Sequence, residues 1–158
     1  MKDRVRLRDT TREDLPTLFK QQADPEANRM AGFTRENPSD REAFAAHWDR
    51  ILRDGSITMK TILLDEKVAG HIGSFEREGA LEITYWIGRK YWGKGIASRA
   101  LSEFLTEMTV RPVYARAAKD NLGSIRVLEK NGFTLSGHDR FFANARGEEI
   151  DEVILVLQ

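Results

Sequence analysis

Residues 83–98 read Ile-Thr-Tyr-Trp-Ile-Gly-Arg-Lys-Tyr-Trp-Gly-Lys-Gly-Ile-Ala-Ser. The first part of this stretch predicts a strand, which runs into a turn that contains glycines. Apolar residues with helical spacing then follow from Ala97 to Met108. Free amides at a helix start, together with the positive end of the helix dipole, bind phosphate. The stretch therefore predicts a strand, a phosphate-binding turn and a helix in direct succession.

Three other interpretations of the turn compete with this one. Residues 88–94 fit the nucleoside-triphosphatase pattern G-x-x-x-x-G-K, but Gly95 stands where a Ser or Thr should hold magnesium. Residues 93–98 begin like the dinucleotide motif G-x-G-x-x-G, but Ser98 replaces its third glycine and a hairpin precedes the unit. A tight strand-to-helix connection without a ligand is the third alternative.

The rest of the chain predicts an α/β fold with a mixed sheet and helices on both faces. The expected order is β-α-α-β-β-β-α-β-α-β-β. Strands are expected at 4–9, 58–64, 67–75, 81–88, 113–118, 133–142 and 149–157, with helices beginning near Thr10, Ser39, Ala97 and Asn121. The segment from 81 to 118 is a strand–helix–strand crossover, so its two strands should be parallel.

Two local features carry further expectations. Thr10 and Glu13 have the spacing of a capping box at the start of the first helix. Residues 24–39 hold two of the four prolines and predict an irregular loop between two helices. A loop of that length in a small domain is often functional.

Composition excludes several classes of function. The 158 residues suit one domain, 1–158, and the formal net charge of zero provides no basic field for nucleic acid. There is no cysteine, and His47, His71 and His138 lack metal-ligand spacing, so no metal is expected. No apolar run approaches the roughly 20 residues of a membrane span. We therefore expect a cytoplasmic protein without membrane or nucleic-acid partners.

Two blocks of sequence resemble the Gcn5-related N-acetyltransferase (GNAT) superfamily. Residues 92–97, Trp-Gly-Lys-Gly-Ile-Ala, are similar to its pattern Gln/Arg-x-x-Gly-x-Gly/Ala, although Trp92 departs from the first position. Residues 120–133, Asp-Asn-Leu-Gly-Ser-Ile-Arg-Val-Leu-Glu-Lys-Asn-Gly-Phe, form the second block. The chain looks most like the branch of ribosomal-protein-alanine N-acetyltransferases. The resemblance implies a GNAT-like fold whose parallel pair splays to hold the cofactor.

The resemblance also implies the activity and the cofactor. The chain is expected to move the acetyl group of acetyl-coenzyme A (acetyl-CoA) to a primary amine by direct attack in a ternary complex. A non-catalytic acyl-CoA-binding or regulatory module is the alternative. The acceptor could be a protein N-terminus or a small-molecule amine, and a monomer and a homodimer are both compatible with the sequence. The expected cofactor-binding residues are Trp86, Ile87, Gly88, Trp92, Gly93, Lys94, Gly95, Ile96, Ala97, Ser98, Asn121 and Ser124.

Two residues are candidates for catalysis. Glu82 alternates with Leu81 and Ile83, so its side chain should leave the face that they bury and could act as the base; the alternative is an exposed strand glutamate. Ser124 lies where the related branch carries a serine near the cofactor sulfur; the alternative is an ordinary residue of the first helical turn. Leu128 occupies the place of the tyrosine that serves as the acid in many family members.

The acceptor site is expected in the 24–39 loop, which in the related branch lines the acceptor. Asn28, Met30 and Phe33 are its candidate substrate-binding residues, and Met30 and Phe33 suggest an apolar wall. The alternative is that this loop packs on its own core.

Overall fold

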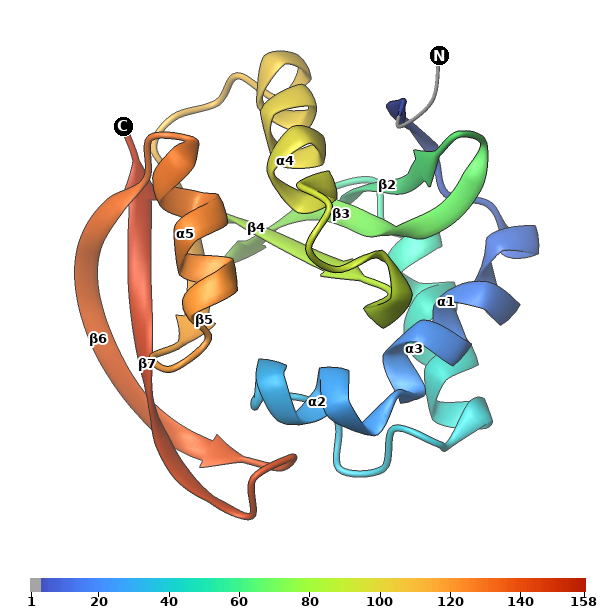
Figure 1. Ribbon diagram of the computed structural model, residues 1–158, viewed down its shortest axis with the longest axis horizontal. Helices are drawn as coiled ribbons and strands as arrows, with labels where there is room; N and C mark the ends of the chain where they lie inside the picture. The colour runs from blue at the N-terminus through green and yellow to red at the C-terminus, as the bar shows by residue number, and fades with distance from the viewer. Residues whose placement is uncertain (1–3) are drawn as a thin grey trace.

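The computed structural model describes residues 4–158 (Figure 1). A seven-stranded sheet runs in the order β1-β2-β3-β4-β5-β7-β6. Its strands are β1 Val5–Asp9, β2 Thr58–Leu64, β3 Lys67–Arg77, β4 Ala80–Ile87, β5 Val113–Ala118, β6 Thr134–Ala143 and β7 Glu148–Leu157. The helices are α1 Leu15–Ala23, α2 Pro25–Ala31, α3 Arg41–Arg53, α4 Ile96–Glu107 and α5 Leu122–Lys130. Apart from α2, this is the predicted order.

β4 and β5 form the parallel pair of the otherwise antiparallel sheet, as predicted. Their ladder covers three residue pairs, from Leu81–Val113 to Ile83–Ala115. Beyond Ile83, β4 continues beside β3 as far as Ile87, whereas β5 pairs with β7. The two halves of the sheet therefore separate at this point, and the second half of β4 has one unpaired edge.

Helices cover both faces of the sheet. Figure 1 shows α4 and α5 on one side, with α1, α2 and α3 on the other. The main core lies under α4, where Leu101 and Phe104 pack against strand residues such as Ile72 and Ile83. A second core on the opposite face joins α1 and α3 through the buried side chains of Leu18, Phe19, Phe44 and Trp48.

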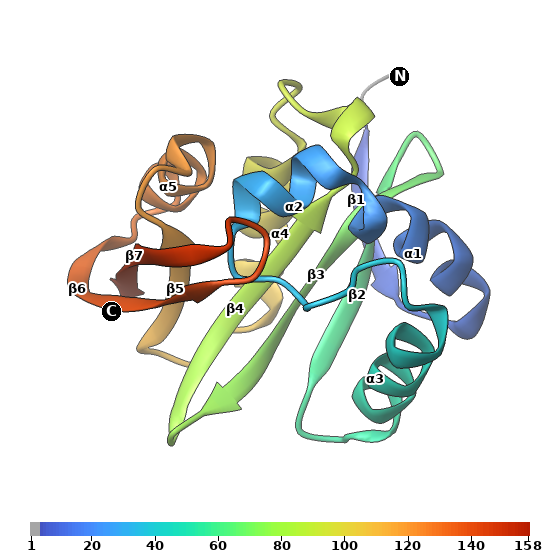
Figure 2. The same cartoon turned by 90° about the horizontal axis from the view of Figure 1, so that it is seen from below.

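The prediction of an irregular loop over residues 24–39 is wrong in its first half, because α2 occupies Pro25–Ala31. Asp24 accepts a hydrogen bond from the amide of Ala27 (2.9 Å), and Pro25 fills the first helical position. Proline suits that position because its missing N–H has no acceptor there anyway. Figure 2 shows α2 lying across the sheet near β4, so this helix helps to enclose the site.

The predicted caps of the first two helices are each displaced. The Thr11 amide donates to Asp14 Oδ2 (3.0 Å), one residue later than the expected Thr10–Glu13 pair. Thr10 turns inward instead, and its hydroxyl oxygen lies 2.9 Å from that of Thr61. The second predicted helix, α3, is capped by Asp40 rather than Ser39. Thr10 therefore contacts the buried Thr61 instead of capping the helix.

Asp14 forms a compact buried cluster with β1 and β2. Arg8 donates to both of its carboxylate oxygens at 2.8 Å, and the Thr61 hydroxyl donates at 2.8 Å. The hydrogen bond from Arg8, followed by that from the Thr11 amide, lowers the pKa of Asp14 to about 2 despite its burial. The cluster ties the start of α1 to the sheet.

Among residues 4–158, no helix has the length and apolar character needed to cross a membrane.

Candidate active site

Two pockets meet where β4 and β5 separate. The first, about 550 Å³, is lined by charged side chains of β3, β4, β5, β7 and the segment after α2, and is called the polar pocket here. The second, about 540 Å³, lies between the glycine turn, the start of α5 and α2, and is called the apolar groove. Both are lined by Ala31, Tyr85, Trp86, Asn121 and Ser124. A molecule in the groove can therefore reach a molecule in the pocket.

The backbone of the glycine turn is open to a ligand. Gly93 and Gly95 have φ angles of +77° and +75°, and a Cβ at either position would meet nothing within 4 Å. Such open, left-handed positions let a ligand approach the backbone. Gly95 begins α4, so the amides of residues 96–98 have no acceptor within the helix. Arg99 braces the turn by donating to the carbonyl of Lys94 (3.1 Å).

Most of the predicted cofactor-binding residues line the apolar groove. The structure brings together Trp86, Ile87, Trp92, Gly93, Gly95, Ile96, Ala97, Ser98, Asn121 and Ser124. Gly88 and Lys94 do not line it. The amide of Gly88 donates instead to the carbonyl of Ala69 (2.8 Å), which fixes the end of β4 to β3.

Trp92 stands where the pattern Gln/Arg-x-x-Gly-x-Gly/Ala has a polar residue, and its side chain forms a hydrogen bond of its own. Its indole N–H donates to the Ile87 carbonyl (2.9 Å), and the side chain is 38% exposed. The tryptophan therefore links the turn to the end of β4 and forms a wall of the groove. Trp86 is anchored similarly, since its indole donates to the carbonyl of Gln21 in α1 (3.1 Å).

The amide of Ile87 faces the gap between the parallel strands. Gly88 donates toward β3, and backbone groups alternate in direction along an antiparallel pair. The N–H of Ile87 therefore points to the opposite edge, from which β5 has already diverged.

Tyr85 and Ser124 lie in contact where the two pockets meet. The phenol oxygen is 2.7 Å from Ser124 Oγ, and the Ser124 amide donates to the Asn121 side chain (3.3 Å). Burial raises the pKa of Tyr85 to about 12, so its hydroxyl stays protonated at neutral pH. Sequence reasoning missed Tyr85 because it shares a strand face with the apolar Ile83 and Ile87, as a core residue would. A buried tyrosine usually needs a partner for its hydroxyl, and that rule could have found it.

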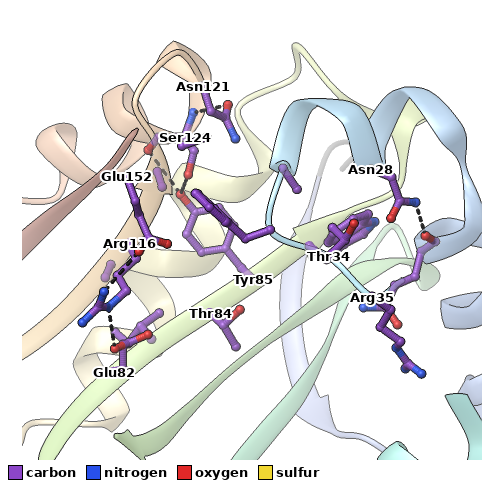
Figure 3. A pocket seen from close by; sticks show the side chains of 18 of the residues that line it. Asn28, Thr34, Arg35, Glu82, Thr84, Tyr85, Arg116, Asn121, Ser124 and Glu152 are labelled. Atoms are coloured by element: carbon purple, nitrogen blue, oxygen red, sulfur yellow. Dashed lines mark hydrogen bonds and ion pairs between the residues drawn. The ribbon is translucent and has the colours of Figure 1, made fainter. Parts of the chain in front are cut away.

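Glu82 is buried rather than exposed, with 7% of its surface accessible. Its Oε2 lies 3.3 Å from Arg116 Nε and 3.5 Å from Arg77 Nε. Arg116 also pairs with Glu152 on β7 and with Asp139 on β6, each at 3.1 Å. Figure 3 shows Glu82, Arg116 and Glu152 together on one side of the polar pocket. Glu82 therefore belongs to an ion-pair network that spans the separated strands.

Glu152 is a second pocket carboxylate that sequence reasoning missed. Burial raises its pKa, although Arg116 acts in the opposite direction. Its position opposite Ala118 depends on the β5–β7 register, which no local sequence pattern reveals.

The three predicted acceptor residues are divided between the pockets. Phe33 lines the polar pocket and packs edge-on against Phe141. Met30 lines the apolar groove. Asn28 lines the polar pocket, but its side-chain amide donates to the carbonyls of Gln22 (2.5 Å) and Asp24 (2.9 Å). Asn28 therefore holds α1 to α2, in addition to its place in the wall.

The described part of the chain contains no cluster of three or more His, Asp or Glu side chains placed to hold a metal ion.

Comparisons with known proteins agree with this geometry. The family model of the acetyltransferase (GNAT) domain matches residues 4–134. An uncharacterized N-acetyltransferase, p20, of Bacillus licheniformis is 28% identical over 94% of this chain and 89% of its own.

Solved structures share the fold. A GNAT-family acetyltransferase from Bacillus anthracis has a TM-score of 0.80 at 21% identity, covering 99% of this chain and 96% of that one. The spermidine N-acetyltransferase of Vibrio cholerae, in complex with CoA and spermine, has a TM-score of 0.79 at 18% identity, with coverages of 96% and 95%. A ribosomal-protein-alanine N-acetyltransferase from Brucella melitensis also reaches 0.79, at 21% identity, with coverages of 96% and 98%.

Proposed function

The chain belongs to the GNAT family of acetyltransferases, and on that premise we propose that it transfers the acetyl group of acetyl-CoA directly to a primary amine. The observation that carries the proposal is the junction of two pockets at Tyr85, Trp86, Asn121 and Ser124. The apolar groove would hold the cofactor, and the polar pocket would hold the amine. Direct transfer needs both substrates to meet in this way.

The cofactor's phosphates fit the glycine turn. The open backbone at Gly93 and Gly95 and the free amides of residues 96–98 form a cradle that a Cβ would fill. The rest of the cofactor would follow the unpaired edge of β4 toward the junction. When bound, acetyl-CoA supplies the activated acyl group.

Polarisation of the acyl carbonyl is assigned to the Ile87 amide, which faces the gap beside β4. A fixed backbone donor stabilises the oxyanion that develops during attack, and such a donor contributes about 2.7–4 kcal/mol to transition-state stabilisation.

Tyr85 and Ser124 are assigned to the departing sulfur. A thiol with a pKa of about 8.5 is already a fair leaving group, so hydrogen bonding can suffice. The 2.7 Å contact holds both hydroxyls at the junction, and the raised pKa keeps the Tyr85 proton in place. Many family members have a tyrosine as the acid at the position of Leu128, and here Tyr85 of β4 would provide the phenol instead.

Glu82 is proposed as the group that accepts the ammonium proton, directly or through water. It lines the polar pocket, and its partner Arg116 links it to Glu152. Glu152 is the second candidate, because its raised pKa favours proton uptake. The two carboxylates also attract an ammonium ion into the pocket before it loses its proton.

The acceptor is proposed to be a protein N-terminus or a small-molecule amine, bordered by Asn28 and Phe33 in the polar pocket. Met30 would instead contact the cofactor in the groove. The cytoplasmic location and the absence of nucleic-acid partners stay predictions from composition.

The test combines cofactor binding with thiol release. The purified protein is titrated with acetyl-CoA by calorimetry and then supplied with a panel of amines while free CoA is measured. Amine-dependent thiol release with stoichiometric N-acetylated product is expected. Tight acetyl-CoA binding without turnover of any amine would contradict the proposal and favour a non-catalytic binding module.

A further inference from the structure

Arg35 is the unusual cation of the polar pocket. Two other arginines of the pocket are ion-paired: Arg77 with Glu82, and Arg116 with Glu82 and Glu152. For Arg35 the structure shows instead a stacking contact with the ring of Phe44, with its guanidinium carbon 5.4 Å from the ring centre. One terminal nitrogen of Arg35 is buried and has no hydrogen-bond partner within residues 4–158.

Thr34, the residue before Arg35, also has a buried polar atom without a partner in the described part of the chain. The hydroxyl of Thr34 also lines the polar pocket and is buried without a hydrogen-bond partner among the described residues. Buried polar groups are normally satisfied, so an unsatisfied one calls for an explanation. Two adjacent unsatisfied donors facing one pocket indicate a missing acceptor that the protein itself does not provide.

The segment that carries these donors is held in place. The Thr34 carbonyl accepts a hydrogen bond from the Asn144 side chain (2.7 Å), and its amide donates to Gly32 (3.1 Å). Phe33 and Arg35 are fixed by aromatic contacts on either side of it. The donors are therefore preorganised, which reduces the entropic cost of binding a ligand.

Among the described residues, no carboxylate forms an ion pair with Arg35 in the way that Glu82 and Glu152 pair with Arg116. Burial lowers the pKa of Arg35, while Asp40 raises it and Arg50 lowers it. His47, which also lines the pocket, has its own pKa lowered by burial and by Arg35. Holding a partly desolvated cation without an anion is costly, so an anionic ligand is favoured there.

The wall of the polar pocket that faces Arg35 carries carboxylates. Figure 3 shows Glu82, Arg116 and Glu152 on one side of the pocket, and Thr34 and Arg35 on the other. The carboxylates attract an ammonium group, whereas the guanidinium and hydroxyl fit a carboxylate or a phosphate. A substrate with both charges would be oriented with its amine toward β4.

We propose that the acceptor carries an anionic group in addition to its amine, and that Arg35 and Thr34 bind this group. The inference rests on the proposed function, because it assigns the acceptor to the polar pocket. A free amino acid carries a carboxylate of this kind, and an aminoalkyl phosphate carries the alternative anion. A polyamine lacks any anion and would bring a further cation to Arg35.

The test uses matched pairs of amines in the thiol-release assay. Phenylalanine is compared with phenethylamine, leucine with 3-methylbutylamine, and phosphoethanolamine with ethanolamine; spermine is the polycation. The anionic member of at least one pair is expected to have the higher kcat/KM, by about tenfold or more. The first two pairs test the carboxylate and the third tests the phosphate.

Arg35→Gln should remove this preference by raising the KM of the anionic member about tenfold while leaving the KM of its counterpart without the anionic group unchanged. Thr34→Val should act in the same direction more weakly. Arg53→Gln is the matched control, because it removes the same charge from an exposed residue of α3 that does not line the pocket. Equal loss for both members of a pair would overturn the assignment of Arg35.

Binding of the same pairs to the CoA complex, measured by calorimetry, separates this inference from the proposed function. Amine turnover without any preference for anionic members would overturn the inference and leave the acetyltransferase assignment intact. A preference for anionic members that Arg35→Gln removes, seen in binding without turnover, would support the inference and contradict the proposed activity.

Discussion

The phenol oxygen of Tyr85 lies 2.7 Å from Oγ of Ser124, and this contact joins β4 to α5 where the two pockets meet. The tyrosine comes from the strand that carries the proposed carbonyl-binding amide of Ile87, and the serine comes from the first turn of the helix after Asn121. Two hydroxyls are thereby placed on the expected path of the cofactor sulfur. The first prediction concerns this pair.

Tyr85→Phe is expected to lower kcat about tenfold, because it removes a donor to the sulfur while keeping the ring. Affinity for acetyl-CoA, measured by calorimetry, should stay within about twofold. The pKa of about 12 predicts that Tyr85 itself causes no loss of activity up to about pH 10. Ser124→Ala should give a smaller loss in the same assay. If both variants keep kcat/KM within twofold of the parent, the pair has no role in catalysis.

Glu82→Gln is expected to lower kcat about 100-fold at pH 7, because the ammonium group loses its proton acceptor. The difference in kcat between the variant and the parent should shrink as the pH rises toward the pKa of the amine, because the amine then binds already deprotonated and needs no base. Acetyl-CoA affinity should be nearly unchanged, since Glu82 does not line the groove. A kcat that is unaffected from pH 6 to 9 would remove Glu82 from the mechanism.

Glu152→Gln is compared with Glu82→Gln in the same assay, because both carboxylates bind Arg116. We expect a smaller loss of kcat than for Glu82→Gln. A larger loss, with a pH profile whose acidic limb follows the raised pKa of Glu152, would transfer the role of base to Glu152.

Gly95→Ala is expected to weaken acetyl-CoA binding at least tenfold. The new methyl group would occupy the open space beside the first amides of α4. The left-handed φ of +75° adds a folding cost of about 1–2 kcal/mol, visible as a lower Tm. Gly55→Ala is the control, because its Cβ also meets nothing within 4 Å but at a residue without positive φ and outside both pockets. Undiminished affinity in Gly95→Ala would exclude the turn as the phosphate site.

Local sequence patterns predicted the features that depend on local physics. The strand–turn–helix at 83–98, the adjacent strands 58–64 and 67–75, and the helix beginning near Asn121 follow from strand alternation, turn chemistry and capping, and the structure confirms each of them. Helix α2 was missed because it has seven residues and begins with a proline. Such a short helix is stabilised mainly by its packing, which the sequence pattern alone does not show.

The residues of the site that were missed depend on contacts between distant segments. Glu152 reaches Arg116 through the β5–β7 register, and Tyr85 of β4 reaches Ser124 because α5 packs on the neighbouring strand β5. Arg35 was visible as a loop residue, but its lack of a hydrogen-bond partner for one buried nitrogen is a property of the folded pocket. Residue types and spacings do not contain this information.

The buried Asp14 cluster predicts how stability depends on pH. The folded-state pKa of about 2 lies below the ordinary value of 3.8, so the contribution of the ionised carboxylate is fully present above about pH 5. It should be lost as the pH falls from about 4 toward 2. The shift corresponds to about 2 kcal/mol of pH-dependent stability.

Asp14→Asn should therefore be less stable than the parent at pH 7, and the difference should narrow by about 2 kcal/mol on acidification toward pH 2. Urea unfolding at several pH values measures both free energies. Asp9→Asn is the matched control: its ion pair with Lys60 is solvent-exposed on the Asp side, so its effect should be small at every pH. A parent–Asp14→Asn difference that does not change between pH 7 and 2 would show that Asp14 stabilises the fold through its shape and hydrogen bonds rather than through its charge.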